Sequence, residues 1–330
     1  MMRLLRVEMT RFRSRRINQV AVLGVLLVSL VMIFGAWQTS KPPSAAEMAQ
    51  AQAGFDMSLK DWEENGEQYV AECVDNQAAE QAINPDAADW GCETYGPPVF
   101  ENWFYPTPTF AENAADVLPS FGLVLVFVAF VMGVSFIAAE FSSGAIGNWL
   151  TFEPRRGRVY GTKVGASGIS VVPIVIVAAT VAAAGSWFVN SINDNVGTMT
   201  SEIWGDVGMS GLRLLLATVV FAMLGVAMGT IVRHTAAAIG IVVGYLIVFE
   251  MIVGGFFQDV RPWLLQLNLQ AVLSDGANYW TTVCETGPTG QVCEGIQKTV
   301  SFEHGATVVG VVALVFVAVA ALVFRRRDVS

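Results

Sequence analysis

Glu250 is the one acidic residue that stands well inside a long apolar run of the sequence. An ionised carboxylate is unfavourable in such surroundings, so it is expected to have a partner or to face a polar cavity. Arg213 lies near the start of the preceding apolar run, where it could reach Glu250 if the two runs form helices that pack together. Two roles stay open for this pair: a substrate or proton site in a translocation path, or an ion pair that joins two helices.

Little else in the sequence could catalyse a reaction or hold a nucleotide. The stretch Gly157-Arg-Val-Tyr-Gly161-Thr162-Lys163 superficially resembles a phosphate-binding loop, but its glycine spacing is one residue short. It also leads into an apolar run instead of following a strand. The two histidines, His234 and His304, are isolated. We therefore expect no catalytic residue, no metal site and no cofactor in this chain.

The four cysteines form two pairs that are close in sequence, Cys73 with Cys92 and Cys284 with Cys293. All four lie in polar stretches between apolar runs. Local pairing is the simplest of the three connectivities, and disulfides persist outside the cytoplasm. Metal binding is the alternative, but no histidine accompanies the cysteines. We predict two local disulfides.

The composition indicates a membrane protein. The chain has 330 residues, of which 54% are hydrophobic and 14% are charged, whereas soluble domains average about 25% charged residues. Each of six apolar runs is long enough for a helix to cross about 30 Å of hydrocarbon. Their continuous rather than alternating pattern argues against a strand barrel. We predict an all-α integral membrane protein whose six spans cover residues 17–38, 117–138, 164–189, 209–232, 236–257 and 305–324.

The basic residues predict that both termini are cytoplasmic, because cytoplasmic segments carry an excess of lysine and arginine. With that orientation, 14 of the 19 basic residues fall inside, and most acidic residues fall outside. Ser14-Arg15-Arg16 faintly resembles a twin-arginine signal, but polar residues follow it and no clear cleavage site is present, so we expect the first span to be retained. The inside residues are Arg3, Arg6, Arg11, Arg13, Arg15, Arg16, Arg155, Arg156, Arg158, Lys163, Arg233 and Arg325 to Arg327.

Three segments outside the spans have distinct patterns. Residues 1–16 place Leu5, Met9 and Phe12 on one helical face surrounded by arginines, which predicts an amphipathic helix lying at the inner membrane interface. A cationic tail that only fixes the topology is the alternative. Residues 39–116 form a long outer loop or cap whose middle, from about Ser44 to Ala82, lacks proline and is predicted to be helical.

The cytoplasmic segment at residues 139–163 is longer than a simple connection needs to be. Ile146, Trp149, Leu150 and Glu153 are spaced as on one helical face, and Pro154 ends that helix. A short amphipathic helix held at both ends between two spans can transmit force. A passive connection is the alternative.

On the outer side we expect a short loop at residues 190–208 and a longer segment at residues 258–304. The apolar part of this longer segment, about residues 262–273, is predicted to dip back into the membrane as a re-entrant element. Two GxxxG pairs, Gly225 with Gly229 and Gly240 with Gly244, would allow close helix packing in lipid. The ordinary glycine content of membrane helices would explain them equally well.

These parts together resemble the permease subunits of the type 2 ABC transporter family. The most specific stretch begins with Glu140-Phe-Ser-Ser-Gly144-Ala-Ile, continues with Pro154-Arg155-Arg156, and ends with Tyr160-Gly161-Thr162-Lys163. It looks like the family's Glu-x-x-x-Gly, Pro-x-x-Arg and Gly-x-Lys pattern. The stretch from Leu224 to Ala238 is similar to the family's junction between the fourth and fifth spans, and Phe324 to Asp328 is similar to its C-terminal end.

The resemblance implies an ATP-driven exporter for a drug-, peptide- or lipid-like substrate in the bacterial cytoplasmic membrane. Residues from about Glu140 to Glu153 would be the coupling helix, residues 1–16 the connecting helix, and residues 325–330 a cytoplasmic tail. Partners would be separate ATP-binding subunits, which hold the ATP and magnesium, a second permease subunit, identical or related, and membrane lipid, with no nucleic acid. The implied coupling residues are Glu140, Phe141, Gly144, Ile146, Trp149, Leu150, Glu153, Arg155 and Arg156.

The long first outer loop with its cysteine pair departs from many members of this family, so the subfamily and substrate stay open. Two other functions compete with the permease. A membrane sensor or scaffold that signals through the outer segment would need no ATP-binding subunit. An intramembrane enzyme would need more polar groups inside the helices than Glu250 alone.

Overall fold

The computed structural model describes residues 2–83, 85, 87–103, 107–287 and 290–326. It forms two compact units. The first contains residues 1–38, 109–283 and 294–330, and the second contains residues 39–108 and 284–293. The end of the predicted cytoplasmic tail, residues 327–330, lies outside the described residues.

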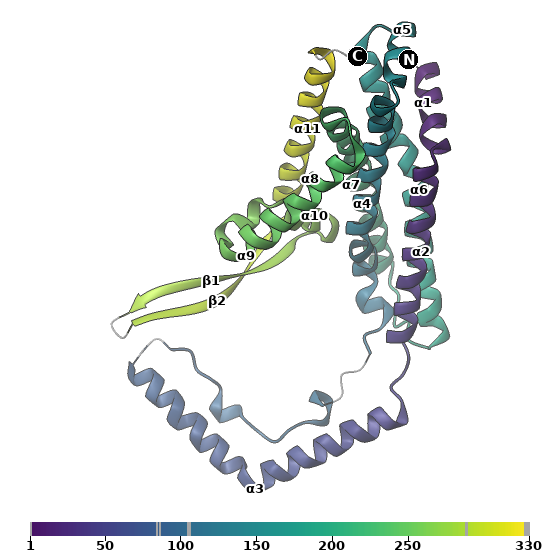
Figure 1. Ribbon diagram of the computed structural model, residues 1–330. Helices are drawn as coiled ribbons and strands as arrows, with labels where there is room; N and C mark the ends of the chain where they lie inside the picture. Colours follow the sequence, from purple (N-terminus) through teal and green to yellow (C-terminus); the bar gives the residue numbers. More distant parts are fainter. Residues whose placement is uncertain (1, 84, 86, 104–106, 288–289, 327–330) are drawn as a thin grey trace. The chain divides into compact units, whose positions relative to one another are not determined.

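Six segments of the first unit are long and apolar enough to cross a membrane, so the fold is that of an all-α integral membrane protein (Figure 1). Each predicted span coincides with one of them, although several helices extend further. The fifth is divided into α8 (Thr235–Tyr245), the π-helical segment η3 (Leu246–Val253) and α9 (Gly254–Phe256). The other five are α2 (Arg16–Thr39), α4 (Phe110–Ser142), α6 (Arg156–Ile192), α7 (Ser201–Val232) and α11 (Phe302–Arg326).

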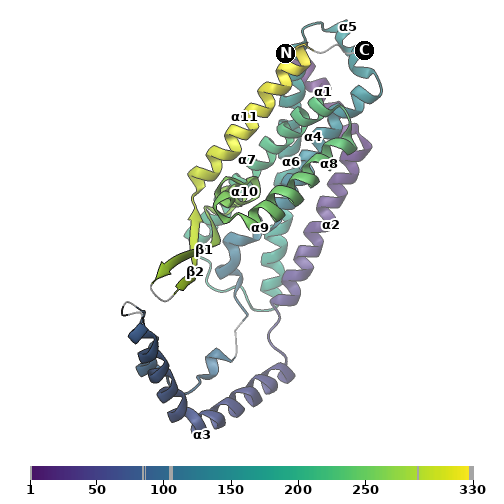
Figure 2. The same ribbon diagram turned by 60° about the vertical axis from the view of Figure 1, so that its left-hand side comes forward.

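The connecting elements of the first unit refine the predicted boundaries. The N-terminal segment forms α1 (Met2–Ser14), and the segment at residues 139–163 contains a separate short helix, α5 (Ala145–Phe152). Because α6 begins at Arg156, the last part of that segment is already the start of the third span helix. Both views place α5 at the end of the bundle where α1 begins and α11 ends (Figures 1 and 2).

The segment after the fifth span differs most from expectation. It contains the 3-10 turn η4 (Gln258–Trp263) and the helix α10 (Leu265–Ser274). A hairpin follows, formed by β1 (Ala277–Gly287) and β2 (Gly290–Val300), which the sequence analysis did not predict. Asp275 and Gly276 both have positive φ angles, 61° and 127°, at the turn from α10 into this hairpin.

The core of the first unit is the packed pair α4 and α7, flanked by α6, α10 and α11. Glycines let the two backbones approach closely. A Cβ atom on Gly225 would overlap the carbonyl oxygen of Phe130, and one on Gly229 would lie 2.7 Å from the Ile137 side chain. Phe121, Leu125 and Leu214 are buried in the same interface. The first predicted GxxxG pair is therefore a helix-packing motif.

The fifth span is packed quite differently. In the most apolar window of α4, 72% of residues are buried within the protein, against 6% for the segment Thr235–Phe256. Gly240 and Gly244 have no atom within 4 Å of an added Cβ in the described residues. The second GxxxG pair therefore does not pack closely against any part of the chain that the structure describes.

The second unit is built on α3 (Ala45–Ile83), so the helix predicted for this segment is present. A capping box fixes its start, because Ser44 and Glu47 exchange side-chain and backbone hydrogen bonds. The chain then returns along this helix through aromatic contacts. Phe55 packs edge-on against Phe100, and Trp62 packs against Tyr95, with ring centroids 5.5 and 5.3 Å apart.

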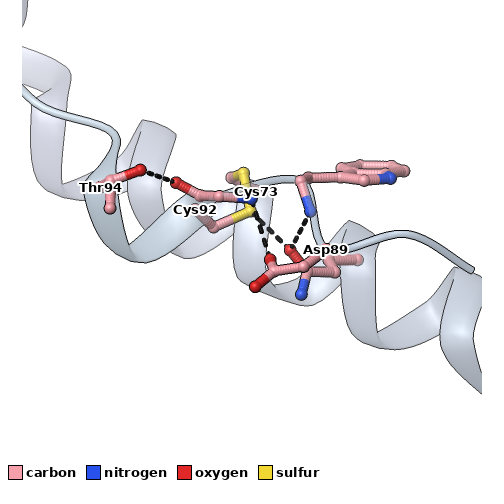
Figure 3. The surroundings of a disulfide bond; sticks show 7 residues. Cys73, Asp89, Cys92 and Thr94 are labelled. Carbon is pink, nitrogen blue, oxygen red and sulfur yellow. Dashed lines mark hydrogen bonds between the residues drawn. A yellow bond between two sulfur atoms is a disulfide. The ribbon is translucent and has the colours of Figure 1, made fainter.

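Both predicted disulfides are present. Cys73 of α3 is bonded to Cys92 of the returning segment, with their Cα atoms 5.7 Å apart (Figure 3). Asp89 and Thr94 hold the adjoining turn by hydrogen bonds to the backbone of Gly91. The Cys284–Cys293 bond joins β1 to β2. The first bond thus fixes the returning segment to α3, and the second closes the hairpin.

Candidate functional site

The short helix α5 is set apart from the spans by two local features. Gly144 has a left-handed conformation with a φ of 67°, which allows the sharp turn between α4 and α5 and strains any residue with a Cβ. At the other end, Glu153 leaves the helical conformation before Pro154, and its carboxylate lies 3.7 Å from the Arg158 guanidinium. These features hold α5 as an independent element between two long helices.

The two faces of α5 have different surroundings. Ile146 is buried, and Trp149 and Leu150 are half-buried against the same hydrophobic cluster as Phe136 and Phe324. Phe152, at the end of the helix, is 84% exposed. An exposed phenylalanine on a helix outside the spans is an apolar surface that a partner protein could cover.

Glu140 does not belong to this exposed surface. It lies in the last turns of α4 and is only 2% exposed, so its expected place on the coupling helix is corrected. It lies in a cluster of five charged residues, which we call the charge cluster: Glu8, Arg11, Arg15, Glu140 and Lys163.

Lys163 is the centre of the charge cluster and is fully buried. Its Nζ atom lies 2.9 Å from Oε2 of Glu8 and 2.6 Å from Oε2 of Glu140. The same ammonium lies 4.8 Å from the centroid of the Phe136 ring. A buried cation of this kind is tolerated only with close partners, because desolvation penalises an unpaired charge strongly.

The arginines complete the charge cluster from the N-terminal side. Arg15 approaches Oε1 of Glu140 at 3.4 Å and donates a hydrogen bond to the Ser135 carbonyl at 2.9 Å. Burial lowers the pKa of the Arg15 guanidinium, and the nearby Glu140 carboxylate opposes that shift. Arg11 lies 3.5 Å from Glu140 and 5.0 Å from the centroid of the Trp149 ring. The cluster therefore connects α1, α4 and α6 and reaches α5.

The apolar face of α1 is directed partly into the protein. Phe12 is buried and packs edge-on against Phe136, with ring centroids 5.2 Å apart, and Glu8 on the same side is buried too. Leu5 and Met9 are half-buried. The face of α1 that was expected to rest on lipid is thus in part a protein interface, because Lys163 contacts Glu8 and Phe136 contacts Phe12.

The remaining predicted coupling residues lie apart from one another. Phe141 packs against Phe324 with ring centroids 6.2 Å apart and lies under the Arg233 guanidinium, so it connects α4 to the end of α11. Arg155 is exposed just before α6, and Arg156 is half-buried at its first position. Of these three, Arg155 is the one that extends the exposed surface of Phe152.

Glu250 and Arg213 do not pair, which corrects the expected contact. Arg213 lies 2.8 Å from Asp275 at the end of α10. Oε1 of Glu250 accepts hydrogen bonds from the Tyr245 hydroxyl at 3.0 Å and from the Gln266 backbone N–H at 2.8 Å. Glu250 thus caps the N-terminus of α10.

A cavity of about 660 Å³ adjoins Glu250. Residues of α4, α7, α8, η3, η4, α10 and α11 line it, and almost all of them are apolar. We call it the Glu250 cavity, because this carboxylate is the one acidic or basic side chain among the residues that line it.

Comparison with known families decides the class of the protein. The family model for the ABC-2 family transporter protein matches residues 4–329. The chain belongs to the ABC-2 transporter family. It is therefore a membrane transport component, and ABC-2 permeases normally work with ATP-binding subunits. No curated protein matches the chain.

Within this ABC-2 transporter, the structure brings together residues from the two ends of the family pattern, since Glu140 and Lys163 are in contact. Sequence reasoning missed Glu8, although its place one helical turn before Phe12 and its isolation among arginines were visible signals. It also missed that Glu250 is bonded to Tyr245 and to the N-terminus of α10, because no local pattern shows which way α10 turns.

Proposed function

We propose that this ABC-2 transporter is the permease subunit of an ATP-driven exporter, and that α5 docks on a separate ATP-binding subunit. The observation that supports this most is the form of α5. It is a short helix outside the spans, fixed at both ends, with Phe152 exposed at its tip and the opposite face anchored.

The charge cluster gives α5 a mechanical connection to the spans. Trp149 packs beneath Arg11, and Arg11 shares Glu140 with Lys163 of α6. A push on α5 would therefore act on α1, α4 and α6 together rather than on one loop. ATP and magnesium would be bound by the partner, whose closure would move these helices and open the path outward.

The second partner would be another permease subunit. The fifth span exposes most of its residues, and an added Cβ on Gly240 or Gly244 would have no described atom within 4 Å. A GxxxG face of this kind favours close contact with a helix of another subunit in the membrane. The assembly would lie in the bacterial cytoplasmic membrane with α5 on the cytoplasmic side, and export a drug-, peptide- or lipid-like substrate.

The test is the substitution Phe152→Asp, assayed by co-purification with the ATP-binding subunit that we expect the neighbouring reading frame to encode. A charge at this exposed position should leave the permease in the membrane but strongly reduce the amount of ATP-binding subunit recovered. Met57→Asp is the control, since Met57 is 73% exposed on α3 in the outer unit.

Normal recovery of the ATP-binding subunit with Phe152→Asp would contradict the docking role of α5. Phe152 is a cleaner target than Trp149 or Leu150, because these two side chains also pack against the bundle.

A further inference from the structure

The Glu250 cavity has the size and lining of a site for a small organic molecule. Its volume of about 660 Å³ lies within the range of about 300–1,000 Å³ that is usual for such sites. The walls are aliphatic and aromatic, with polar groups gathered at one place, where Glu250, Tyr245 and Gln266 lie together.

The one acidic or basic side chain that lines the cavity is the carboxylate of Glu250. Its Oε1 atom accepts hydrogen bonds from two neutral donors, the Tyr245 hydroxyl and the Gln266 backbone N–H. Among the residues lining the cavity there is no lysine, arginine or histidine. Arg213, the cation expected to neutralise this carboxylate, pairs with Asp275 instead. A carboxylate in apolar surroundings without a counter-cation gains most from a cationic ligand.

The aromatic side chains point to the same kind of ligand. Phe127, Phe130, Phe316 and Trp263 are among the lining residues. The faces of aromatic rings attract cations, and quaternary ammonium groups are recognised in this way. An anionic ligand would meet repulsion from Glu250 and no compensating donor side chain of positive charge.

We propose that the Glu250 cavity binds a cationic amphiphile, a molecule with an apolar body and one ammonium-type group, whose cation pairs with Glu250. That this molecule is the exported substrate rests on the proposed exporter function, whereas its binding to the permease does not.

The position of the cavity suits an amphiphile that is dissolved in lipid. Val124, Ile241 and Trp263 line the cavity and are themselves well exposed at the surface of the bundle. Glu250 is 15 residues beyond the start of α8 at Thr235, which corresponds to about 22 Å along a helix. The ligand can therefore enter from the bilayer, and its cation would lie toward the outer end of the fifth span.

The experiment measures binding of radiolabelled dodecyltrimethylammonium to the full-length permease in phosphatidylcholine nanodiscs, with empty nanodiscs subtracted. The control ligand is the neutral isostere in which carbon replaces the ammonium nitrogen. The wild-type chain should bind the cation at least about tenfold more tightly than the isostere, because only the cation can form a charge pair with the Glu250 carboxylate.

Two variants locate the site. Glu250→Gln keeps an oxygen that accepts from Gln266 and removes the charge, so it should weaken cation binding about tenfold and leave the isostere within about twofold. Val312→Trp fills the cavity from α11 and should abolish binding of both ligands.

Equal affinity of the cation for the wild type and Glu250→Gln would overturn the proposal. Equal affinity of the cation and the isostere for the wild type would overturn it as well. If Glu250→Gln does not assemble, the ratio of these two wild-type affinities is enough to test the proposal. Failure of both ligands to bind the wild type would overturn it too. None of these binding measurements needs the ATP-binding subunit. A negative result for the cavity can therefore be told apart from a negative result for the docking of α5.

Discussion

The fourth and fifth spans follow one another along the chain and carry the same glycine spacing, yet they are packed in opposite ways. On α7, Gly225 and Gly229 lie against the backbone and side chains of α4. On the fifth span, Gly240 and Gly244 face open space. A GxxxG pair therefore marks a helix face that can be approached closely, and the rest of the fold determines whether this chain supplies the partner.

The carboxylates of the two regions differ in the same way. Glu140, at the end of the helix that packs on α7, is enclosed with three cations of its own chain. Oε1 of Glu250, on the fifth span, accepts hydrogen bonds from two neutral donors, Tyr245 and Gln266. The packed region has its electrostatic partners built in, whereas the carboxylate of the open region has no ion pair among the described residues and lies beside a cavity. This difference suits a rigid contact between helices around Glu140 and a binding site beside Glu250.

The largest expected effect comes from breaking the closed charge cluster with Lys163→Met. Lys163 is fully buried between Glu8 and Glu140, so its removal leaves two buried carboxylates without their closest partner. The free energy of unfolding should fall by about 3–5 kcal/mol. Denaturant-induced unfolding in bicelles measures this change.

The double variant Glu8→Met with Lys163→Met is the matched control. It also removes the carboxylate of Glu8, while Glu140 keeps Arg11 and Arg15 as partners. It should recover much of the lost stability, because apolar side chains of similar size can replace a buried ion pair. A single variant as stable as the wild type would show that the cluster is not a closed unit.

The next effect separates the two glycine faces. Gly225→Ala places a methyl group against the Phe130 carbonyl and should lower the free energy of unfolding by about 1–3 kcal/mol. Gly240→Ala should change it little in the isolated chain, because nothing lies within 4 Å of the added atom in the described residues. The same unfolding assay is run on both variants. Equal losses of unfolding free energy would contradict the difference in packing between the two glycine pairs.

The smallest effect concerns the cap that Glu250 provides for α10. Glu250→Ala removes the acceptor of the Gln266 N–H and should destabilise α10 by about 1 kcal/mol. Glu250→Gln retains an oxygen acceptor and should have a smaller effect. Amide hydrogen exchange at Gln266 reports this directly, with faster exchange expected for alanine than for glutamine. Unchanged exchange in both variants would show that the carboxylate does not hold the helix.

Features fixed by local composition could be predicted from the sequence. Runs of apolar residues defined the six spans, absence of proline between Ser44 and Ala82 indicated α3, and the spacing of the cysteines indicated both disulfides. Pro154 also marked the end of α5 correctly. Each of these depends on length, periodicity or neighbours in the chain.

Features that depend on rotation and long-range packing could not be predicted. The positions of Arg213 and Glu250 along their predicted helices were compatible with an ion pair. The sequence does not show, however, which face each helix turns toward the other. The π-helical segment changes the helical register around Glu250. The hairpin does have a local signal, since Tyr279 to Val283 are rich in β-forming residues.

The order of the cysteines has a consequence for biosynthesis. Each disulfide joins neighbours in the sequence, first with second and third with fourth. The chain is inserted from its N-terminus, so Cys73 and Cys92 emerge together well before Cys284 is synthesised. Oxidation in order of emergence then yields the native pairs directly. The chain should mature with an oxidant alone, without a disulfide isomerase to exchange mispaired bonds.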